Sequence, residues 1–232
     1  MVKRSKRMKE IDQKLELGKT YKLNEAVDFL KACPPTRFDQ SMDISIRMGI
    51  DPKKSDQLVR GMVTLPYGTG QVITVAVIAK GDKAREATEA GADFVGAEDL
   101  LEKIKNGWTD FSVLIATPDM MRELGKLGKV LGPRGLMPTP KGGTVTTDVA
   151  KAVKESKGGK IEFKVDKTGN LNNAVGKMSF AVEDLVKNIE TLLHAINRAK
   201  PASAKGIYLR SMYLSTTMGP GLKIDTQSLG LS

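Results

Sequence analysis

The sequence predicts a mixed fold in which both chain ends build one α+β domain, an antiparallel sheet with helices, and the middle forms an inserted α/β domain. The first observation is the distribution of charge. Residues 1–67 carry 14 basic and 9 acidic side chains, residues 161–232 carry 9 and 6, and residues 68–160 carry 14 and 12. The second is that the ends and the middle differ in hydrophobic periodicity. We therefore predict one domain from residues 1–67 plus 160–232 and another from residues 68–159.

Strands and helices alternate in the middle segment. Residues 72–79 (VITVAVIA) form a β-branched apolar run that is typical of a strand buried on both faces. The other elements predicted here are helices at 82–90 and 97–105, strands at 94–95 and 112–116, and a helix that starts at Pro118. This order indicates a small parallel α/β unit.

The outer segments alternate with a period of two. One face of a predicted strand is apolar, through Met42, Ile44, Ile46 and Met48, and the other carries Asp43, Ser45 and Arg47. Residues 58–65 are predicted to pair with this strand after a turn at Asp51-Pro52. The remaining predictions are a hairpin-like connection at 166–170 between strands 160–165 and 174–178, a helix at 182–199 and a strand at 206–215.

The composition argues against catalytic and metal-binding classes. Cys33 is the only cysteine, so the chain can form neither an internal disulfide nor a cysteine-based zinc site. His194 is the only histidine, and its place in a helical pattern favours a surface or packing role. We therefore expect no catalytic residue, no metal and no cofactor.

The chain shows no membrane or export signal. No apolar run reaches the roughly 18 residues needed to cross a bilayer. The N-terminal cluster lacks the apolar region of a signal peptide and is interpreted as a basic arm made of Lys3, Arg4, Lys6, Arg7 and Lys9. We expect a cytoplasmic protein without membrane contact.

The charge balance favours a polyanionic partner. The formal net charge is +10 and the isoelectric point is near 9.6. Lysine and arginine placed on phosphates release condensed counterions, which stabilises complexes with nucleic acids. A basic protein without any nucleic-acid role remains the alternative on charge alone.

The most unusual stretch is KLGKVLGPRGLMPTPKGG at residues 126–143. It holds four basic residues, no acidic residue, five glycines and three prolines. Such a composition predicts a loop rather than a regular helix or a central strand. A basic surface for nucleic-acid backbone and a purely structural loop are equally compatible with it.

Nucleotide-cofactor motifs are weak. Gly68-Thr69-Gly70 precedes a predicted strand, whereas a dinucleotide fingerprint follows one, and no Walker A string is present. The segment Ala79-Lys80-Gly81-Asp82 lies between strand and helix but has a single glycine.

Two short strips could meet RNA. Residues 215–221 (STTMGPG) follow the last predicted strand, and their hydroxyls and glycines would let a backbone approach a ribose, although an ordinary turn is the alternative. Arg37-Phe38-Asp39 places a ring between charges. An exposed Phe38 could stack on a base, while a buried phenylalanine is the more common case.

Five strings together resemble one family. They are GKVLGPRGLMPTPKGGTV (128–145), RGMVTLPYGTG (60–70), AGADFVG (90–96), FKVDKTG (163–169) and STTMGP (215–220). Their order and content are similar to those of the L-one family of bacterial large-subunit ribosomal proteins. The resemblance covers nearly the whole chain, and the first string is the most specific.

The resemblance implies a fold and a function. The fold would be a terminal α+β domain with an inserted Rossmann-like α/β domain. The chain would be a structural protein of the large ribosomal subunit, a monomer outside the ribosome, that binds large-subunit (23S) rRNA at the mobile stalk beside the tRNA exit site. It would assist release of deacylated tRNA from the E site and repress translation of its own operon mRNA.

The resemblance also implies contact residues. Carried over by matching motif, the rRNA-binding set is Arg37, Phe38, Asp39, Lys164, Lys167, Thr168, Gly169, Ser211, Thr217, Met218 and Gly219. A secondary RNA or tRNA contact would involve Lys129, Arg134 and Lys141 of the inserted domain. The alternatives are a nucleotide-dependent enzyme built on the middle unit and a basic DNA-binding regulator, for which no helix-turn-helix signature is seen.

Overall fold

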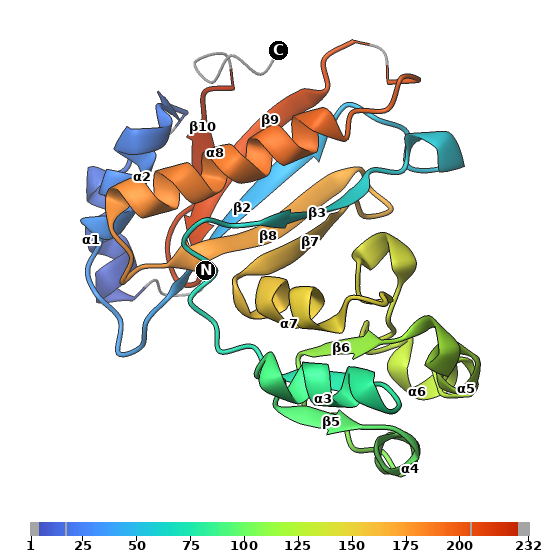
Figure 1. Cartoon of the computed structure of the whole chain (residues 1–232). Coiled ribbons are helices and arrows are strands. Elements are labelled where there is room, and N and C mark those ends of the chain that lie inside the picture. Colours follow the sequence, from blue (N-terminus) through green and yellow to red (C-terminus); the bar gives the residue numbers. More distant parts are fainter. Residues whose placement is uncertain (1–4, 17, 205, 227–232) are drawn as a thin grey trace. The chain divides into compact units, whose positions relative to one another are not determined.

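The computed structural model describes residues 5–16, 18–204 and 206–226 and divides into two compact units (Figure 1). Unit 1 comprises Met1–Gly70 and Glu162–Ser232, so it is built from both ends of the chain, and unit 2 comprises Gln71–Ile161. Both units combine helices and sheets, in agreement with the predicted mixed fold.

Unit 1 is organised around a five-stranded sheet in the described residues. The strand order is β1-β10-β9-β2-β8, with β1 parallel to β10 and the other pairs antiparallel. The strands are β1 (Thr20–Tyr21), β2 (Ser41–Met48), β8 (Asn170–Lys177), β9 (Leu209–Thr216) and β10 (Leu222–Ile224).

Strand β2 alternates as its sequence predicts. Met42, Ile44, Ile46 and Met48 are at most 3% exposed. Helices α2 (Leu23–Lys31) and α8 (Val182–Arg198) contact each other and cover one face of the sheet (Figure 1). The other face therefore carries the polar residues of β2, because side chains of a strand alternate between its two faces.

The predicted pairing of residues 58–65 with β2 is wrong. Strand β3 (Arg60–Thr64) instead pairs with β7 (Lys160–Lys164) in a separate two-stranded sheet. Both hydrogen-bonding edges of β2 are already used, by β8 on one side and β9 on the other. The 3₁₀ turn Ser55–Gln57 lies in the connection, which is too long for a tight hairpin.

The tight connection expected at residues 166–170 is present. The Asp166 amide donates to the Asn170 carbonyl over 2.8 Å. The strands on its two sides nevertheless belong to different sheets, since β7 pairs with β3 and β8 pairs with β2. The turn therefore joins two sheets rather than closing one simple hairpin.

Unit 2 contains a parallel sheet of three strands in the order β5-β4-β6. Its strands are β4 (Val75–Ile78), β5 (Phe94–Gly96) and β6 (Val113–Ala116). Its helices are α3 (Asp82–Glu89), α4 (Glu98–Lys105), α5 (Met121–Lys126), α6 (Gly128–Leu131) and α7 (Val149–Lys157), with 3₁₀ turns at Pro118–Met120 and Pro140–Gly142. The predicted alternation of strands and helices is confirmed.

Two cores lie on opposite faces of this sheet. Val75 and Val77 of β4 pack with α3 and α7, through residues such as Ala87 and Val153. Ala76 and Ile78 belong to the second core, which α4, α5 and α6 complete with Leu100, Ile104, Leu124 and Leu131. The fully buried β4 confirms the centre of the apolar run predicted at 72–79. The predicted start is wrong, because Val72 precedes the strand and is 95% exposed.

Two segments are more helical than their composition suggests. Residues 126–143 were predicted to lack helix, but Gly128–Leu131 forms one helical turn, which the buried Leu131 anchors in the core of unit 2. In the N-terminal basic cluster, Lys3 and Arg4 lie outside the described residues, and Lys6–Lys14 forms helix α1. Its Ile11 is 1% exposed, so packing stabilises this otherwise polar helix.

Asn188 fixes the segment through which the chain leaves unit 1. This residue of α8 is fully buried. Its Oδ1 accepts from the Tyr67 amide at 3.2 Å, and its Nδ2 donates to the carbonyls of Gly68 and Val175, both at 2.9 Å. One amide side chain thus satisfies three backbone groups from two other segments.

We predict that Asn188→Ala lowers the free energy of unfolding by about 2–4 kcal/mol, because it leaves one buried and two partly buried backbone groups without their side-chain partner. Thermal or urea unfolding measures this change. Glu190→Ala, an exposed position on the same helix, is the control and should change stability by less than about 0.5 kcal/mol. Equal stability of the two variants would contradict the anchoring role.

Candidate nucleic-acid interface

Three loops of unit 1 meet at one end of the large sheet. Strand β2 starts there, and β8 and β9 end there, with Ser41 opposite Lys177 and Met42 opposite Thr216. The loop edge is defined here as residues 36–41, 177–180 and 216–220. It brings together two predicted strips that are about 180 positions apart in the chain.

Backbone hydrogen bonds hold these loops together. The Thr217 amide donates to the Ser41 carbonyl at 3.1 Å, and the Ser41 amide donates to the Thr217 hydroxyl oxygen at 3.1 Å. On the other side of Ser41, the Met178 amide donates to the Gln40 carbonyl at 2.9 Å. The loop edge is therefore a continuation of the sheet, with its backbone largely satisfied.

The loop edge presents two large apolar side chains to solvent. Phe38 is 53% exposed and Met218 is 54% exposed. Between the two alternatives drawn from the sequence, the exposed ring is the observed one, and its face is available for stacking. Arg37 and Thr217 are exposed beside them.

Asp39 helps to hold the edge in shape. Its carboxylate accepts from the Ser179 hydroxyl at 2.8 Å and from the Ser179 amide at 3.2 Å. These bonds tie the loop before β2 to the loop after β8. The carboxylate that was expected to face RNA is thus partly engaged within the protein.

The space beside Thr216 is too small for a side chain at position 219. A Cβ atom at this position would lie 2.1 Å from the Thr216 hydroxyl oxygen, although the backbone dihedral itself is ordinary. Any side chain would push the strip away from the end of β9.

The other predicted residues lie at the opposite end of β2. There the Met48 amide donates to the Gly169 carbonyl at 2.9 Å, and Ser211 stands opposite Arg47. Exposed residues of this second group are Lys164, Lys167 and Thr168. The two ends of the eight-residue strand are about 23 Å apart, so the predicted set forms two groups rather than one.

A polar sheet face connects the two groups. Ser45 of β2 lies between Asn172 of β8 and Tyr213 of β9, and Tyr213 is followed by Lys223 of β10. Asn172, Tyr213 and Lys223 are exposed, and Ser45 is partly buried. The polar face comprises Asp43, Ser45, Arg47, Asn170, Asn172, Ser211, Tyr213, Ser215 and Lys223.

Of these residues, the sequence predicted Ser211 as a contact and included Ser215 in the candidate strip 215–221. The alternation along β2 already directed Asp43, Ser45 and Arg47 away from the core. The sequence did not show which strands lie beside β2, because strand pairing joins segments that are far apart in the chain. Burial raises the pKa of Asp43 above its ordinary value, and the Lys177 ammonium opposes this shift.

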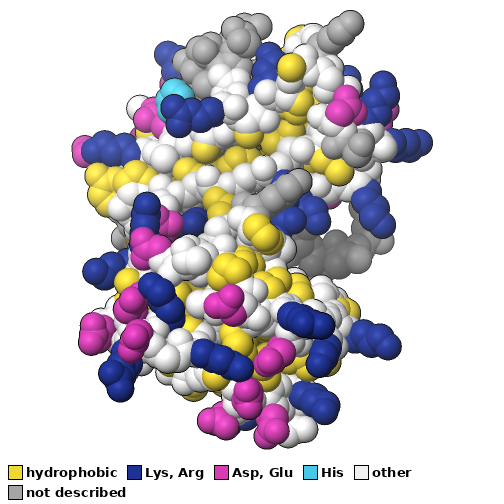
Figure 2. All heavy atoms as spheres, turned by 45° about the vertical axis from the view of Figure 1, so that its right-hand side comes forward, with side chains coloured by type: hydrophobic (Ala, Val, Ile, Leu, Met, Phe, Trp, Pro, Cys, Tyr) yellow, Lys and Arg dark blue, Asp and Glu magenta, His cyan; other side chains and the backbone are white. Residues whose placement is uncertain are grey.

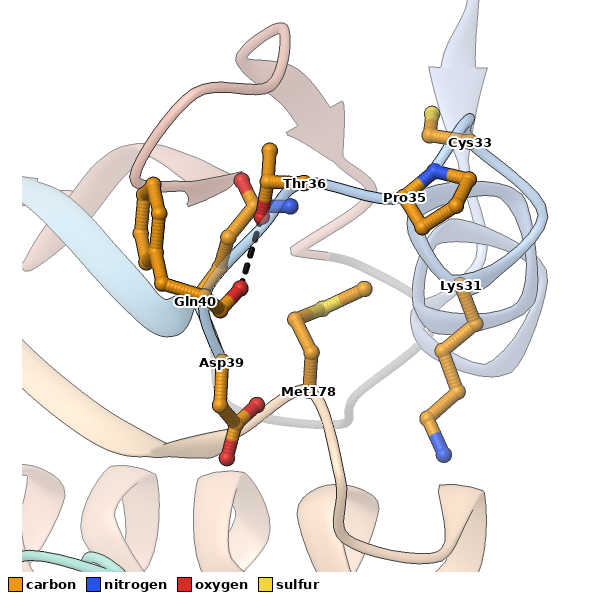
Figure 3. Close-up of a pocket in the computed structure, with 8 residues that line it drawn as sticks. Lys31, Cys33, Pro35, Thr36, Asp39, Gln40 and Met178 are labelled. Carbon is orange, nitrogen blue, oxygen red and sulfur yellow. Dashed lines mark hydrogen bonds between the residues drawn. The ribbon is translucent and has the colours of Figure 1, made fainter.

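A recess lies beside Phe38. Its volume is about 340 Å³ and its walls include Phe38, Pro35 and Cys33. Lys31 reaches it from α2, whereas Asp39 and Met178 come from the two loops (Figure 3). The Thr36 hydroxyl donates to the Phe38 carbonyl at 2.7 Å and shapes its rim. The Lys31 ammonium donates to the Phe180 carbonyl and the Asp39 carboxylate accepts from Ser179, so both charged groups of the recess also hold its loops together.

The secondary residues belong to unit 2 and are less concentrated. Lys129 on α6 and Arg134 are exposed, and Arg134 donates to the Thr109 hydroxyl. Lys141 falls in the Pro140–Gly142 turn, but its side chain lies outside the described residues. Figure 2 shows basic and acidic side chains interspersed over the visible face of this unit.

The part of the chain that the structure describes carries neither a metal-binding cluster nor a membrane-spanning helix. The described ranges contain no cluster of three or more His, Cys, Asp or Glu residues able to hold a metal ion. His194 is exposed on α8, as expected for a surface residue. Among the helices that the structure describes, none is long and apolar enough to cross a membrane.

Comparison with known proteins agrees with the motif strings. The profile of the ribosomal protein L1p/L10e family matches residues 30–220. The chain belongs to this family. It is 60% identical over 228 residues to the large ribosomal subunit protein uL1 of Protochlamydia amoebophila, covering 98% of this chain and 97% of that protein.

Other members are similarly close. The uL1 proteins of Chlamydia trachomatis serovar L2b and Corynebacterium glutamicum are 59% and 55% identical, over 99% and 97% of this chain and 99% and 96% of their own lengths. Membership of the L1p/L10e family confirms the resemblance seen in the sequence. It also confirms that the chain is a ribosomal protein rather than an enzyme.

The turn in the second group is held by one carboxylate. Asp166 Oδ1 accepts from the Thr168 hydroxyl at 2.6 Å and from the amides of Thr168 and Asn170 at 2.8 and 2.9 Å. The Thr168 hydroxyl, followed by these amides, holds the pKa of Asp166 below its ordinary value of 3.8. Since the charged form is favoured, the turn is stabilised above the ordinary pKa and loses that stabilisation as the pH falls through the lowered one.

We predict that Thr168→Val raises the pKa of Asp166 back toward 3.8, because it removes the hydroxyl that makes the largest contribution. The carboxyl carbon resonance of Asp166, followed by NMR during an acid titration, measures this shift. Thr168→Ser retains the hydroxyl and should keep the pKa low. A serine variant that titrates like the valine variant would contradict this account.

Proposed function

We propose that this protein is a structural constituent of the large ribosomal subunit and binds large-subunit (23S) rRNA through unit 1. Family membership supports this proposal, because the relatives are large-subunit proteins. The observation that carries it is the uncovered polar face of the five-stranded sheet, which ends in exposed Phe38 and Met218.

The chemistry of this surface fits RNA. Serine, asparagine and tyrosine groups on a twisted sheet can follow a shallow groove and hydrogen-bond 2′-hydroxyls, while lysines at its ends neutralise phosphates. In this proposal Arg37, Phe38, Thr217, Met218 and Gly219 make the first contact. The second contact is made by Lys164, Lys167, Thr168, Gly169 and Ser211. Asp39 stabilises the loops of the first contact through its bonds to Ser179.

The family resemblance supports further proposals about place and role. The rRNA target would be the mobile stalk beside the tRNA exit site, where the protein would assist release of deacylated tRNA from the E site. The same surface would bind the protein's own operon mRNA and repress its translation. The protein would be cytoplasmic and monomeric outside the ribosome.

We propose that unit 1 is the α+β rRNA-binding domain and that unit 2 is the inserted Rossmann-like domain. Lys129, Arg134 and Lys141 of unit 2 would give a secondary contact with RNA or tRNA. Sedimentation of the protein with large subunits, and a mobility shift of a stalk rRNA fragment, test the proposed function as a whole.

We predict that Thr217→Ala and Met218→Asp each weaken binding to a stalk rRNA fragment by about 1–3 kcal/mol, the usual range for a central contact. Calorimetric titration at fixed salt measures the change. Val72→Asp is the control for the added charge, since Val72 is 95% exposed and lies in unit 2. Unchanged affinity for both loop-edge variants would exclude this contact.

We predict that the logarithm of the RNA association constant falls linearly with the logarithm of salt concentration, because binding releases counterions. Lys167→Ala should reduce this slope by about 1 if its ammonium sits on a phosphate, whereas Thr217→Ala should leave it unchanged. A slope that is flat for the unaltered protein would contradict phosphate contact. Equal affinity for duplex DNA would favour a DNA-binding regulator instead.

A further inference from the structure

Both backbone polar groups of Met218 are held by side chains from distant parts of the chain. Its amide donates to Oε1 of Gln40 at 3.0 Å. Its carbonyl accepts from Nη1 of Arg7 at 2.7 Å. A residue in a loop would ordinarily bond water or nearby backbone, so these two bonds fix the peptide on both sides of Met218.

Arg7 bridges two loops with one guanidinium group. Besides the bond to Met218, its Nε donates to the Pro34 carbonyl at 2.9 Å. The Pro34 segment leads directly into Phe38, and the Met218 segment follows β9. Arg7 therefore joins the two loops that carry the exposed apolar side chains of the loop edge.

Helix α1 holds Arg7 in place. It lies on α1, whose N-terminus is capped by the Ser5 hydroxyl, which accepts from the Met8 amide at 3.3 Å. Ile11, one turn after Arg7, is 1% exposed and anchors the helix against unit 1. Gln40 is equally constrained, at 5% exposure.

Most of the hydrogen-bonding capacity of the Arg7 guanidinium is directed into the protein. The third guanidinium nitrogen, Nη2, is buried and has no partner among the described residues. Nε and Nη1 each donate to a backbone carbonyl, and the bond from Nη1 to Met218 lies at the surface. Its effect on a ligand would therefore pass through the loops that it holds.

We propose that Arg7 and Gln40 are positioning residues that clamp the backbone of Met218 and so present its side chain to RNA. The inference rests on the proposed RNA contact of Met218. Arginine suits this role because its planar fork offers two donors in fixed directions, whereas a lysine ammonium is a single point. With both backbone groups bonded, the Cα–Cβ bond of Met218 keeps one direction, so its 54% exposed side chain always leaves the surface at the same place.

The test is a double-mutant cycle on the full chain. Arg7→Lys keeps the charge but cannot bridge both carbonyls, and it should weaken binding to a stalk rRNA fragment by about tenfold, the effect of one charge-assisted hydrogen bond. In a Met218→Ala background the same change should weaken binding by only about twofold, because the positioned side chain is absent. The slope of the salt dependence should stay the same, which separates positioning from loss of a phosphate contact.

Lys6→Met is the matched control. Lys6 is exposed on the same helix, and its loss should change affinity by no more than about twofold at physiological salt. Equal penalties for Arg7→Lys with and without the Met218 side chain would overturn the proposal, since Arg7 would then act on stability or on RNA independently. A slope reduced by about 1 in Arg7→Lys would overturn it as well.

A second measurement separates this inference from the proposed function. Methyl NMR of labelled methionine reports on Met218 without RNA, with Met218→Ala used for assignment. Arg7→Lys and Gln40→Met should each shift or broaden the Met218 methyl signal, while Lys6→Met should not. An unmoved Met218 signal would overturn the positioning role of Arg7 and Gln40, even if the protein binds RNA. A moved signal, together with no RNA binding by the unaltered protein, would contradict only the proposed function.

Discussion

Burial of one face of the five-stranded sheet is the constraint on which the rest of unit 1 depends. Met42, Ile44 and Ile46 are almost completely removed from solvent beneath α2 and α8. Because side chains alternate along a strand, this burial directs Ser45 and Arg47 to the opposite face. A slip of one residue in the register would exchange the two faces, so the hydrophobic core also determines which groups a ligand can meet.

The position of β2 between β8 and β9 distributes the candidate contacts. Both edges of β2 are hydrogen-bonded from Ser41 to Met48, with one register shift after Met42 against β8 and another after Arg47 against β9. The loop edge lies at its start, and the turn that carries Lys167 lies at its end. The sheet thereby acts as a rigid spacer of about 23 Å between two groups of exposed side chains. Contacts held on such a scaffold need little ordering when a ligand binds.

Acidic residues within a basic unit have a consistent explanation. Asp39 bonds Ser179 across two loops, and Asp166 bonds Thr168 and the backbone of its own turn. In both places the carboxylate accepts hydrogen bonds from the protein and shapes a segment with exposed basic or apolar groups. The net positive field of unit 1 thus coexists with carboxylates, because these negative charges are used to define local geometry.

The sequence by itself determined the family, through motif strings, and the local elements whose periodicity is strong, such as the β2 alternation and the buried β4. It also indicated Phe38, as a ring between two charged residues, and Met218, through the family motif. Only the tertiary structure decided that β3 pairs with β7 rather than with β2. It also decided that Tyr213 lies on the polar face and that Arg7 and Gln40 bond the backbone of Met218. The physical reason is separation along the chain. Periodicity reflects neighbours within a few residues, whereas strand pairing and the bond between Arg7 and Met218 join groups up to 211 positions apart.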